Sequence, residues 1–247
     1  PYRRQRQMCI RDSLESLGHH IIDLVPGLIG LKGKQSFFAD IAGIRADVKV
    51  DLYIESTHVC SEQGELQLTN YGISGIPVFQ LSRIATRALS EQKKVYATLN
   101  FVPFWEKEQC LTYFKERFKK ADEKHIGEAL IGFFPEKLIP VLLEESHIKA
   151  AKYANRLQTE ELERFIDTVQ GLRVDITDWN TFDTAQVTAG GVDTDEIDAE
   201  TMESKLCPGL YFAGEMVDID GICGGYNLQW AWSSGAVAGI HVARELS

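Results

Sequence analysis

The sequence has no excess of basic residues, no long hydrophobic run and no paired cysteines, and each absence excludes a class of protein. Its 26 lysines and arginines are outnumbered by 36 aspartates and glutamates, which gives a formal net charge of −10. This balance argues against a nucleic-acid or anionic-membrane partner, since both need a basic face. No apolar run approaches the ~18 residues of a membrane span, and the basic start lacks the apolar stretch of a signal peptide. We therefore expect a soluble chain.

The cysteines and histidines show no metal-binding or redox spacing. The five cysteines, at positions 9, 60, 110, 207 and 223, form no C-x-x-C pair, which favours free thiols in a reducing cytoplasm. The six histidines include no H-E-x-x-H motif and no Cys/His cluster. The pattern Asp193-x-Asp195-Glu196-x-Asp198 lacks the glycine and closing glutamate of a calcium loop, which favours a solvated acidic connection. We expect no metal site.

The remaining composition is that of a globular protein. The chain has 247 residues, of which 44% are hydrophobic and 25% charged, so it can bury a sizeable core. Residues 1–11 hold four arginines and no acid, a pattern that suits either a basic arm or a translated vector junction. We favour the junction and predict that residues 1–12 are a non-native leader outside the fold.

Hydrophobic periodicity changes along the chain. Alternating apolar residues predict strands over 46–69, with a turn near Gln63-Gly64, and another strand near 172–176. Between them, residues 88–170 follow a helical period. Leu111, Phe114 and Phe118 form one apolar stripe, and a second stripe runs from Leu162 to Val169. We interpret this block as a helical insertion within a β-rich domain.

The last forty residues combine a short apolar run, a glycine-rich loop and a long apolar segment. Residues 210–213 predict a buried strand, and residues 227–245, apolar on nearly every face, predict a buried helix. Gly224 and Gly225 lack Cβ, so their backbone can approach a flat ring or adopt positive φ. The N–H groups of the following helix would face the negative N1/C2=O edge of a flavin, and Glu215 could accept hydrogen bonds from ribityl or ribose hydroxyls. A tight turn before a buried helix is the structural alternative.

Three segments, in the same order as in a known family, carry a resemblance. Residues 209–235 resemble the C-terminal flavin-binding signature of the BaiN/RdsA family of NAD(P)/FAD-dependent oxidoreductases, also called aminoacetone oxidase-like or YhiN-type flavoproteins. Residues 69–77 resemble its Thr-His-x-Gly-x-Ser-Gly-Pro segment, departing at Asn70 and Ile76, and residues 186–192 resemble its Val-Thr-x-Gly-Gly-Val segment. The resemblance covers residues 14–247.

The resemblance implies an α/β (α+β) fold of three domains. These are a Rossmann-like FAD domain split between the chain ends, a β-barrel-like middle domain, and a helical domain inserted into the barrel. On this chain the β-rich middle domain would comprise 13–87 and 171–200, the helical insert 88–170, and the C-terminal strand–loop–helix part of the FAD-binding domain 201–247.

The resemblance also implies an activity and a set of cofactor contacts. Members are expected to pass hydride between NAD(P)H, FAD and a small-molecule substrate. Gly214 and Glu215 would lie near the ribityl chain, and Thr188, Gly190 and Gly191 near the flavin ring. The remaining implied contacts belong to the glycine loop and its helix, along the ring edge: Gly221, Gly224, Gly225, Tyr226, Asn227 and Leu228.

One departure from the family is large. Its members open with a strand and Gly-x-Gly-x-x-Gly, which holds the FAD pyrophosphate, whereas Gly27-x-x-Gly30-x-x-Gly33 has the wrong spacing. We therefore expect the parent protein to be the flavoenzyme, and this chain to be a fragment that binds FAD weakly or not at all and is inactive alone. The alternative is a non-catalytic truncated chain or an interaction module that does not retain FAD. The sequence assigns no catalytic residue and no oligomeric state.

Overall fold

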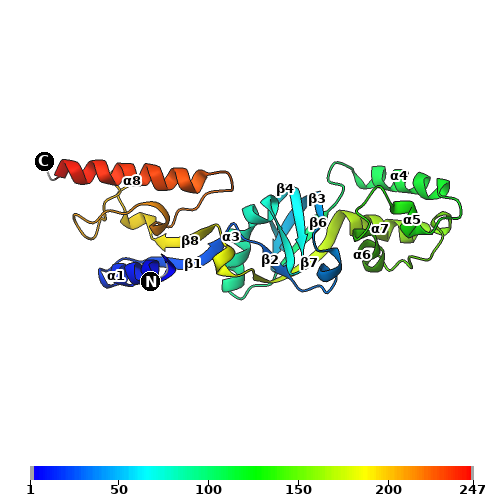
Figure 1. Cartoon of the computed structure of the whole chain (residues 1–247), viewed down its shortest axis with the longest axis horizontal. Coiled ribbons are helices and arrows are strands. Elements are labelled where there is room, and N and C mark those ends of the chain that lie inside the picture. The colour runs from blue at the N-terminus through cyan, green and yellow to red at the C-terminus, as the bar shows by residue number, and fades with distance from the viewer. Residues whose placement is uncertain (1–2, 246–247) are drawn as a thin grey trace. The chain divides into compact units, whose positions relative to one another are not determined.

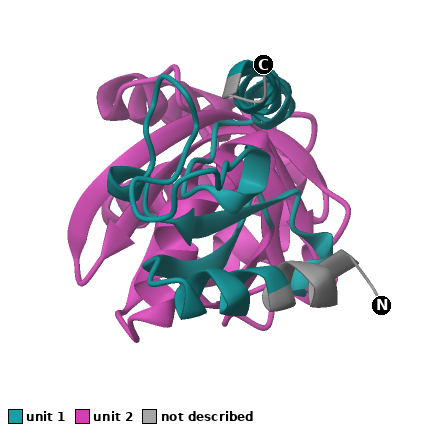
Figure 2. Cartoon of the chain, turned by 90° about the vertical axis from the view of Figure 1, so that its left-hand side faces the viewer, with its two compact units in different colours: residues 1–29, 181–247 teal, residues 30–180 magenta. Residues whose placement is uncertain are grey.

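The computed structural model describes residues 3–245, which fold into two compact units (Figures 1 and 2). Unit 1 combines the residues up to 29 with those from 181 onward, and unit 2 comprises residues 30–180. Each unit has its own hydrophobic core. The fold is therefore of the mixed α/β class, and each unit is described by itself below.

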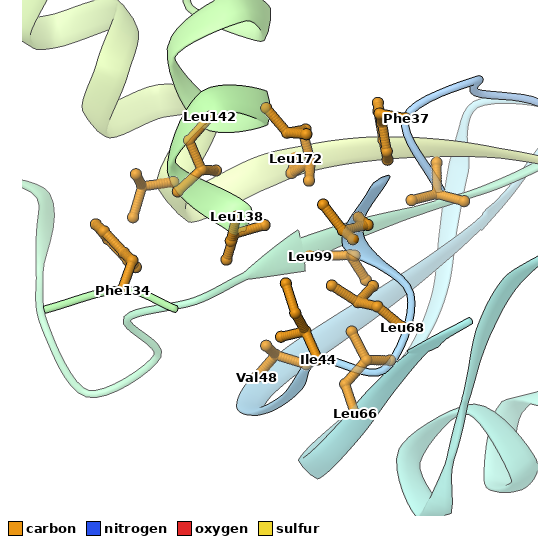
Figure 3. Packing of buried hydrophobic residues seen from close by; sticks show 14 of the residues in the cluster. Phe37, Ile44, Val48, Leu66, Leu68, Leu99, Phe134, Leu138, Leu142 and Leu172 are labelled. Atoms are coloured by element: carbon orange, nitrogen blue, oxygen red, sulfur yellow. The ribbon is translucent and has the colours of Figure 1, made fainter. Parts of the chain in front are cut away.

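Unit 2 is built on a closed barrel of six strands in the order β2-β5-β4-β3-β6-β7. Every pairing is antiparallel, and β2 closes the barrel by pairing with both β5 and β7. Alternate residues point inward, as the period of two along a strand requires; Val48, Leu66, Leu68 and Leu99 are buried and lie together in Figure 3. The strands are β2 (Leu31–Gly33), β3 (Arg45–Ile54), β4 (Thr57–Thr69), β5 (Gly72–Gly75), β6 (Val95–Asn100) and β7 (Leu172–Trp179).

Along the chain of unit 2, helices are interspersed with the strands of the barrel. The short α2 (Phe38–Ile41) and the longer α3 (Ile76–Ser90) contact barrel strands. The other four helices form a group with an aromatic core, in which the Phe114 and Phe165 rings meet edge to face at 5.5 Å. Figure 3 shows Leu138 and Leu142 of this group beside Leu172, so one core continues from barrel to helices. The group comprises α4 (Lys107–Lys120), α5 (Ile126–Leu130), α6 (Leu138–Glu145) and α7 (Thr159–Gly171), with a 3-10 turn at Ala154–Arg156.

An ion pair at the start of α7 predicts a pH-dependent stability. Lys152 Nζ donates to Glu161 Oε1 at 2.7 Å, and this hydrogen bond is the main cause that lowers the pKa of the Glu161 carboxyl. A depressed folded-state pKa stabilises the fold above the unfolded value of about 4.3, and that contribution disappears as pH falls through the folded pKa. We expect Lys152→Met to lower the free energy of unfolding by about 1 kcal/mol at neutral pH.

The same Lys152→Met change should have little effect at a pH below the folded-state pKa of Glu161. Urea unfolding of both proteins at a series of pH values, from neutral downward until their difference in stability stops changing, measures this dependence. Lys149→Met is the matched control, since Lys149 is exposed and makes no ion pair with any residue in the described part of the chain. A loss of stability that stays the same at every pH would contradict the role of the ion pair.

Unit 1 consists of two helices, a two-stranded ribbon and several short turns. β1 pairs antiparallel with β8, and a bulge between Ile22 and Val25 shifts their register. A small core joins both ends of the chain: Leu14, Val192, Ile197, Met202, Phe212, Val217 and Ala238. The elements are α1 (Arg3–Ser16), β1 (Ile21–Gly27), β8 (Val187–Val192) and α8 (Tyr226–Glu245), with 3-10 turns at Phe182–Thr184, Thr194–Glu196 and Gly214–Met216.

Most of the predicted elements are confirmed, but two local predictions are wrong. The chain reverses at Glu55 and Ser56, both at positive φ, whereas Gly64 pairs with Val48 inside β4. The first half of β4 is largely exposed and shows no apolar alternation, so the pattern placed the turn too late. Residues 210–213 form no strand beyond a single bridge at Tyr211, because their backbone groups bond to the loop around Met202–Ser204.

The helix predicted over 227–245 is confirmed as α8, but its predicted burial is wrong. Trp232 is 68% exposed and Leu228 61% exposed. The side of α8 that faces the rest of unit 1 is instead partly polar: Ser234 is buried, and Asn227 is half-buried. These polar groups form hydrogen bonds to a backbone segment, described below, and they turn the apolar residues outward.

The compact units differ from the predicted domain ranges. Residues 13–29 and 181–200, predicted as parts of the β-rich domain, lie in unit 1, because β1 pairs with β8. The barrel strand β6 falls inside the range 88–170 predicted as helical. Of the predicted leader 1–12, residues from Arg3 onward form most of α1, and residues 1–2 lie outside the described residues.

Three further observations bear on function. In the part of the chain that the structure describes, no helix is both long enough and apolar enough to cross a membrane. Among the same residues, no group of three or more histidine, cysteine or acidic side chains could hold a metal ion. The four described cysteines, Cys60, Cys110, Cys207 and Cys223, are free thiols, and burial raises the pKa of Cys60 and Cys110.

Candidate functional site

A cavity of about 380 Å³ lies within unit 1, a volume in the range of small-molecule sites. One side is formed by the start of β8 together with Leu28, and the other by residues 215–225 and the first turns of α8. The walls are mostly apolar, and the polar groups are few. The lining residues are Leu28, Gln186, Val187, Thr188, Glu215, Ile219, Ile222, Gly224, Gly225, Asn227, Leu228, Trp230 and Ala231.

The 214–221 segment forms part of this cavity and is attached to α8 at both of its ends. At one end, Gly214 N donates to Ser234 Oγ at 2.9 Å, and Trp230 Nε1 donates to Gly214 O at 3.0 Å. At the other end, Gly221 N donates to Asn227 Oδ1 at 2.8 Å, and Asn227 Nδ2 donates to Gly221 O at 2.9 Å. Asn227, Trp230 and Ser234 follow helical spacing, so one face of α8 supplies all four bonds.

The other side of the same segment is attached to β8 by two carboxylates. Glu215 Oε1 accepts from Thr188 N at 2.7 Å, and Asp218 Oδ1 accepts from Gly190 N at 2.9 Å. Asp218 N also donates to Val192 O at 3.0 Å. The 214–221 segment therefore lies between α8 and β8 and is bonded to both, which fixes one wall of the cavity.

The glycine loop after this segment presents backbone to the cavity. Gly224 has φ 127° and Gly225 has φ 90°, in the region that favours glycine. A Cβ on Gly225 would meet no atom within 4 Å, so its backbone faces open space. The first N–H groups of α8 follow directly and have no partner within the helix. Together with the helix dipole, they give this edge of the cavity a positive potential that suits an electron-rich ligand edge.

Gly190 and Gly191, both predicted near a flavin ring, do not line the cavity. A Cβ on Gly190 would lie 2.4 Å from Asp23 O, and one on Gly191 would lie 2.5 Å from Met216 O. Both residues have positive φ, 97° and 144°. Their lack of a side chain lets β8 pack tightly against β1 on one side and the 214–221 segment on the other.

The other predicted site residues divide into two groups. Six of them line the cavity together: Thr188, Glu215, Gly224, Gly225, Asn227 and Leu228. Gly214 and Gly221 lie at the ends of the 214–221 segment, outside the lining, and Tyr226 is 59% exposed. A Cβ on Gly224 would lie 3.4 Å from the Tyr226 ring, so Tyr226 covers the loop from outside.

Sequence reasoning missed several lining residues. Gln186 and Val187 belong to the quoted 186–192 motif, and Ile219 and Ile222 to the glycine-loop signature, so proximity in sequence could have found them. Leu28 had no sequence signal. It is buried and has φ 50°, an unusual backbone conformation for a branched aliphatic residue.

A basic residue lies behind the Glu215 side of the site. The buried Arg11 guanidinium approaches Glu215 O at 3.5 Å, at the outer limit of a hydrogen bond. Burial lowers the pKa of Arg11, and the nearby Glu215 charge opposes this shift. Glu215 thus has a cationic neighbour in α1, while its Oε1 atom is bonded to β8.

Comparison of the sequence with known proteins identifies relatives of this chain. The chain is 44% identical over 224 residues to a 3-dehydro-bile acid delta(4,6)-reductase of Clostridium scindens, a match covering 91% of this chain and 55% of that protein. It is 29% identical over 220 residues to a ribosomal RNA dihydrouridine synthase of Escherichia coli, covering 89% and 52%. A protein of the same name from Haemophilus influenzae is 30% identical over 198 residues, covering 79% and 47%.

The chain thus spans about half the length of the curated relatives it matches. The family model for the HI0933-like protein Rossmann domain matches residues 9–241, nearly the whole chain, including the barrel and the glycine loop. On these grounds the chain belongs to the HI0933-like Rossmann-domain family.

Proposed function

We propose that this chain forms the flavin-ring side of the active site in an FAD-dependent oxidoreductase that passes hydride between NAD(P)H, flavin and a small organic substrate. The observation that carries the proposal is the cavity edge made by Gly225 and the first turn of α8. There the backbone faces open space with φ 90°, at the positive end of a 20-residue helix.

The residues that line the cavity fit a flavin ring in shape and polarity. Leu28, Ile219 and Ile222 offer apolar walls to a flat ring, and the loop and helix N–H groups offer donors along one edge. Glu215 stands at the cavity with a carboxylate suited to hydroxyl groups of a ribityl chain. When bound, the flavin supplies hydride transfer, which these side chains cannot perform.

The chain's own residues contribute binding, orientation and exclusion of water. A ring that binds against the apolar lining would displace water there, and this would strengthen the interaction of the N–H groups with an electron-rich ring edge. The bonds from Glu215 and Asp218 to β8 hold the cavity wall in place before any ligand arrives. Such preorganisation suits a reaction that depends on positioning more than on a protein nucleophile.

The names of the relatives narrow the proposed substrate class. One is a reductase of a dehydro-bile acid, and the others are synthases of dihydrouridine in ribosomal RNA. We propose a small organic molecule with a reducible double bond as the substrate, because the net charge of −10 disfavours an RNA partner. The greater identity to the bile-acid enzyme supports the same choice.

A flavin titration tests the proposal. The sequence has no Gly-x-Gly-x-x-Gly to hold a pyrophosphate, so we expect contacts with the ring and ribityl chain alone. Riboflavin, FMN and FAD should then bind with affinities within about threefold of one another, which corresponds to a difference in binding free energy of less than about 0.7 kcal/mol. All three should be weak enough to be lost on desalting. Flavin fluorescence and the visible spectrum measure the dissociation constants.

A matched pair of variants locates the binding. Leu228→Glu places a carboxylate in the first turn of α8 at the cavity, where it opposes an electron-rich ring edge without weakening the helix. Trp232→Glu adds the same charge one turn further along, at a side chain outside the lining. We expect the first to abolish riboflavin binding and the second to leave it within about twofold. Equal effects, or no binding by the unmodified chain at millimolar flavin, would refute the proposal.

A further inference from the structure

The loop from Gly221 to Asn227 is closed by a single side chain. The Asn227 amide both accepts from Gly221 N at 2.8 Å and donates to Gly221 O at 2.9 Å. The two bonds join the first residue of the loop to the last. We propose that Asn227 is a positioning residue, which holds the glycine loop in the geometry that forms one edge of the cavity. The effect of Asn227 on flavin binding rests on the function proposed above.

The loop needs such a closure because its own sequence leaves it flexible. Gly224 and Gly225 are exposed and lack side chains that could anchor them, and the Ile222 side chain is 54% exposed. Glycine loses more conformational freedom on ordering than any other residue. Two other bonds of this loop are a long contact of Cys223 Sγ with Gln186 Oε1, at 4.0 Å, and the helical bond from Gln229 N to Gly225 O.

The chemistry of both partners matches this closure. A planar amide presents one acceptor and one donor side by side, and these suit the N–H and C=O groups of a single residue. Gly221 is matched to it, because a Cβ there would lie 2.9 Å from Tyr226 Cβ. An aspartate at 227 would have nearly the same shape but no donor, and its carboxylate would face the Gly221 carbonyl oxygen.

The position of Asn227 links the closure to the ligand edge. It is the second residue of α8, and it lines the cavity. One residue therefore connects the first turn of the helix, which contributes Asn227 and Leu228 to the cavity lining, with the loop that carries Gly224 and Gly225. Loss of the amide should free the loop while leaving the helix and the Gly214 end of the segment attached through Trp230 and Ser234.

Hydrogen exchange tests the positioning role without any flavin. We expect Asn227→Ala and Asn227→Asp to speed amide exchange in residues 221–228 by about tenfold or more, as for a locally opened segment. Asn227→Asp introduces a negative charge favourable to the helix N-terminus, so this loosening should occur without a lower thermal midpoint. Ser234→Ala is the matched control on the same face of α8; it should leave exchange in residues 221–228 unchanged.

Riboflavin titration tests the link to the cofactor. We expect Asn227→Ala, which adds no charge, to weaken riboflavin binding about tenfold or more. Ser233→Ala should have little effect, because Ser233 is an exposed residue of α8 outside the cavity lining, and its Oγ accepts from Gln229 Nε2. Unchanged exchange in both Asn227 variants would overturn the inference. Faster exchange with unaltered riboflavin affinity would overturn the positioning role at the cavity. If the unmodified chain binds no flavin, the proposed function fails, and the exchange result alone decides whether Asn227 holds the loop.

Discussion

Replacing Gly190 by alanine is expected to reduce the stability of unit 1 more than any surface change in the chain. The added Cβ would lie 2.4 Å from Asp23 O and 2.8 Å from Ile22 O, both backbone atoms of the paired strand β1. Gly190 sits at the bulge of the β1–β8 ribbon with φ 97°, which an alanine adopts only with strain. Steric overlap with backbone and positive φ together should cost about 4 kcal/mol or more.

Gly225→Ala separates the two causes of this loss. Gly225 has a similar φ of 90°, but its Cβ would meet no atom within 4 Å. It therefore reports the backbone strain alone, about 1 kcal/mol. Urea unfolding measures both variants, followed by the fluorescence of Trp230 and Trp232 in a background where Trp105 and Trp179 of unit 2 are phenylalanine. Equal losses in the two variants would show that close packing of β8 contributes nothing.

Replacing His19 by leucine is expected to cost unit 1 about 3 kcal/mol, because it leaves two polar partners without their bonds. His19 is only 3% exposed. Its Nδ1 lies 2.7 Å from Glu196 Oε2, and its Nε2 lies 3.0 Å from Ser204 Oγ. These bonds join His19, two residues before β1, to the loop that follows β8 in the sequence.

The hydrogen-bond pattern assigns the tautomer of His19. Ser204 Oγ already accepts from Leu206 N at 3.0 Å and Cys207 N at 2.8 Å, which uses both of its lone pairs. Its proton must therefore go to His19 Nε2, and His19 Nδ1–H donates to Glu196. A neutral imidazole satisfies every partner in this network, whereas leucine satisfies none.

His20→Ala is the natural control for His19→Leu. The His20 side chain is 65% exposed, and its contact with Asp193 Oδ2, at 3.3 Å, lies at the surface. We expect its removal to change the free energy of unfolding by less than about 0.5 kcal/mol. The same urea experiment compares the two variants. A His19→Leu variant as stable as His20→Ala would mean that the buried network does not hold the two parts of unit 1 together.

Sequence patterns predicted the barrel and the helical group where one face of an element is fully buried. In β3, Val48, Val50 and Leu52 point inward and are 0% exposed, so the alternation was clear. In α7, Leu162, Phe165, Ile166 and Val169 are all buried, and the stripe was equally clear. The first half of β4 carries no such signal, because its side chains are mostly exposed, and the turn at Glu55 and Ser56 contains no glycine or asparagine.

The candidate site was found by its motifs and not by its periodicity. The glycine loop and the 186–192 motif contain most of the cavity lining, but the pattern could not distinguish a ligand contact from close packing at Gly190 and Gly191. It also could not foresee that α8 faces unit 1 with Asn227 and Ser234. Their partners are backbone groups of Gly221 and Gly214, and a backbone partner leaves no trace in hydrophobic patterning.

The attachment of the 214–221 segment has a consequence for divergence within the family. On the α8 side, the four bonds described above end on backbone N–H or C=O groups of Gly214 and Gly221. The identity of a side chain such as Ile219 therefore plays no part in those bonds, although that side chain lines the cavity. Substitutions at such positions can therefore alter the shape of the pocket while these backbone bonds stay intact.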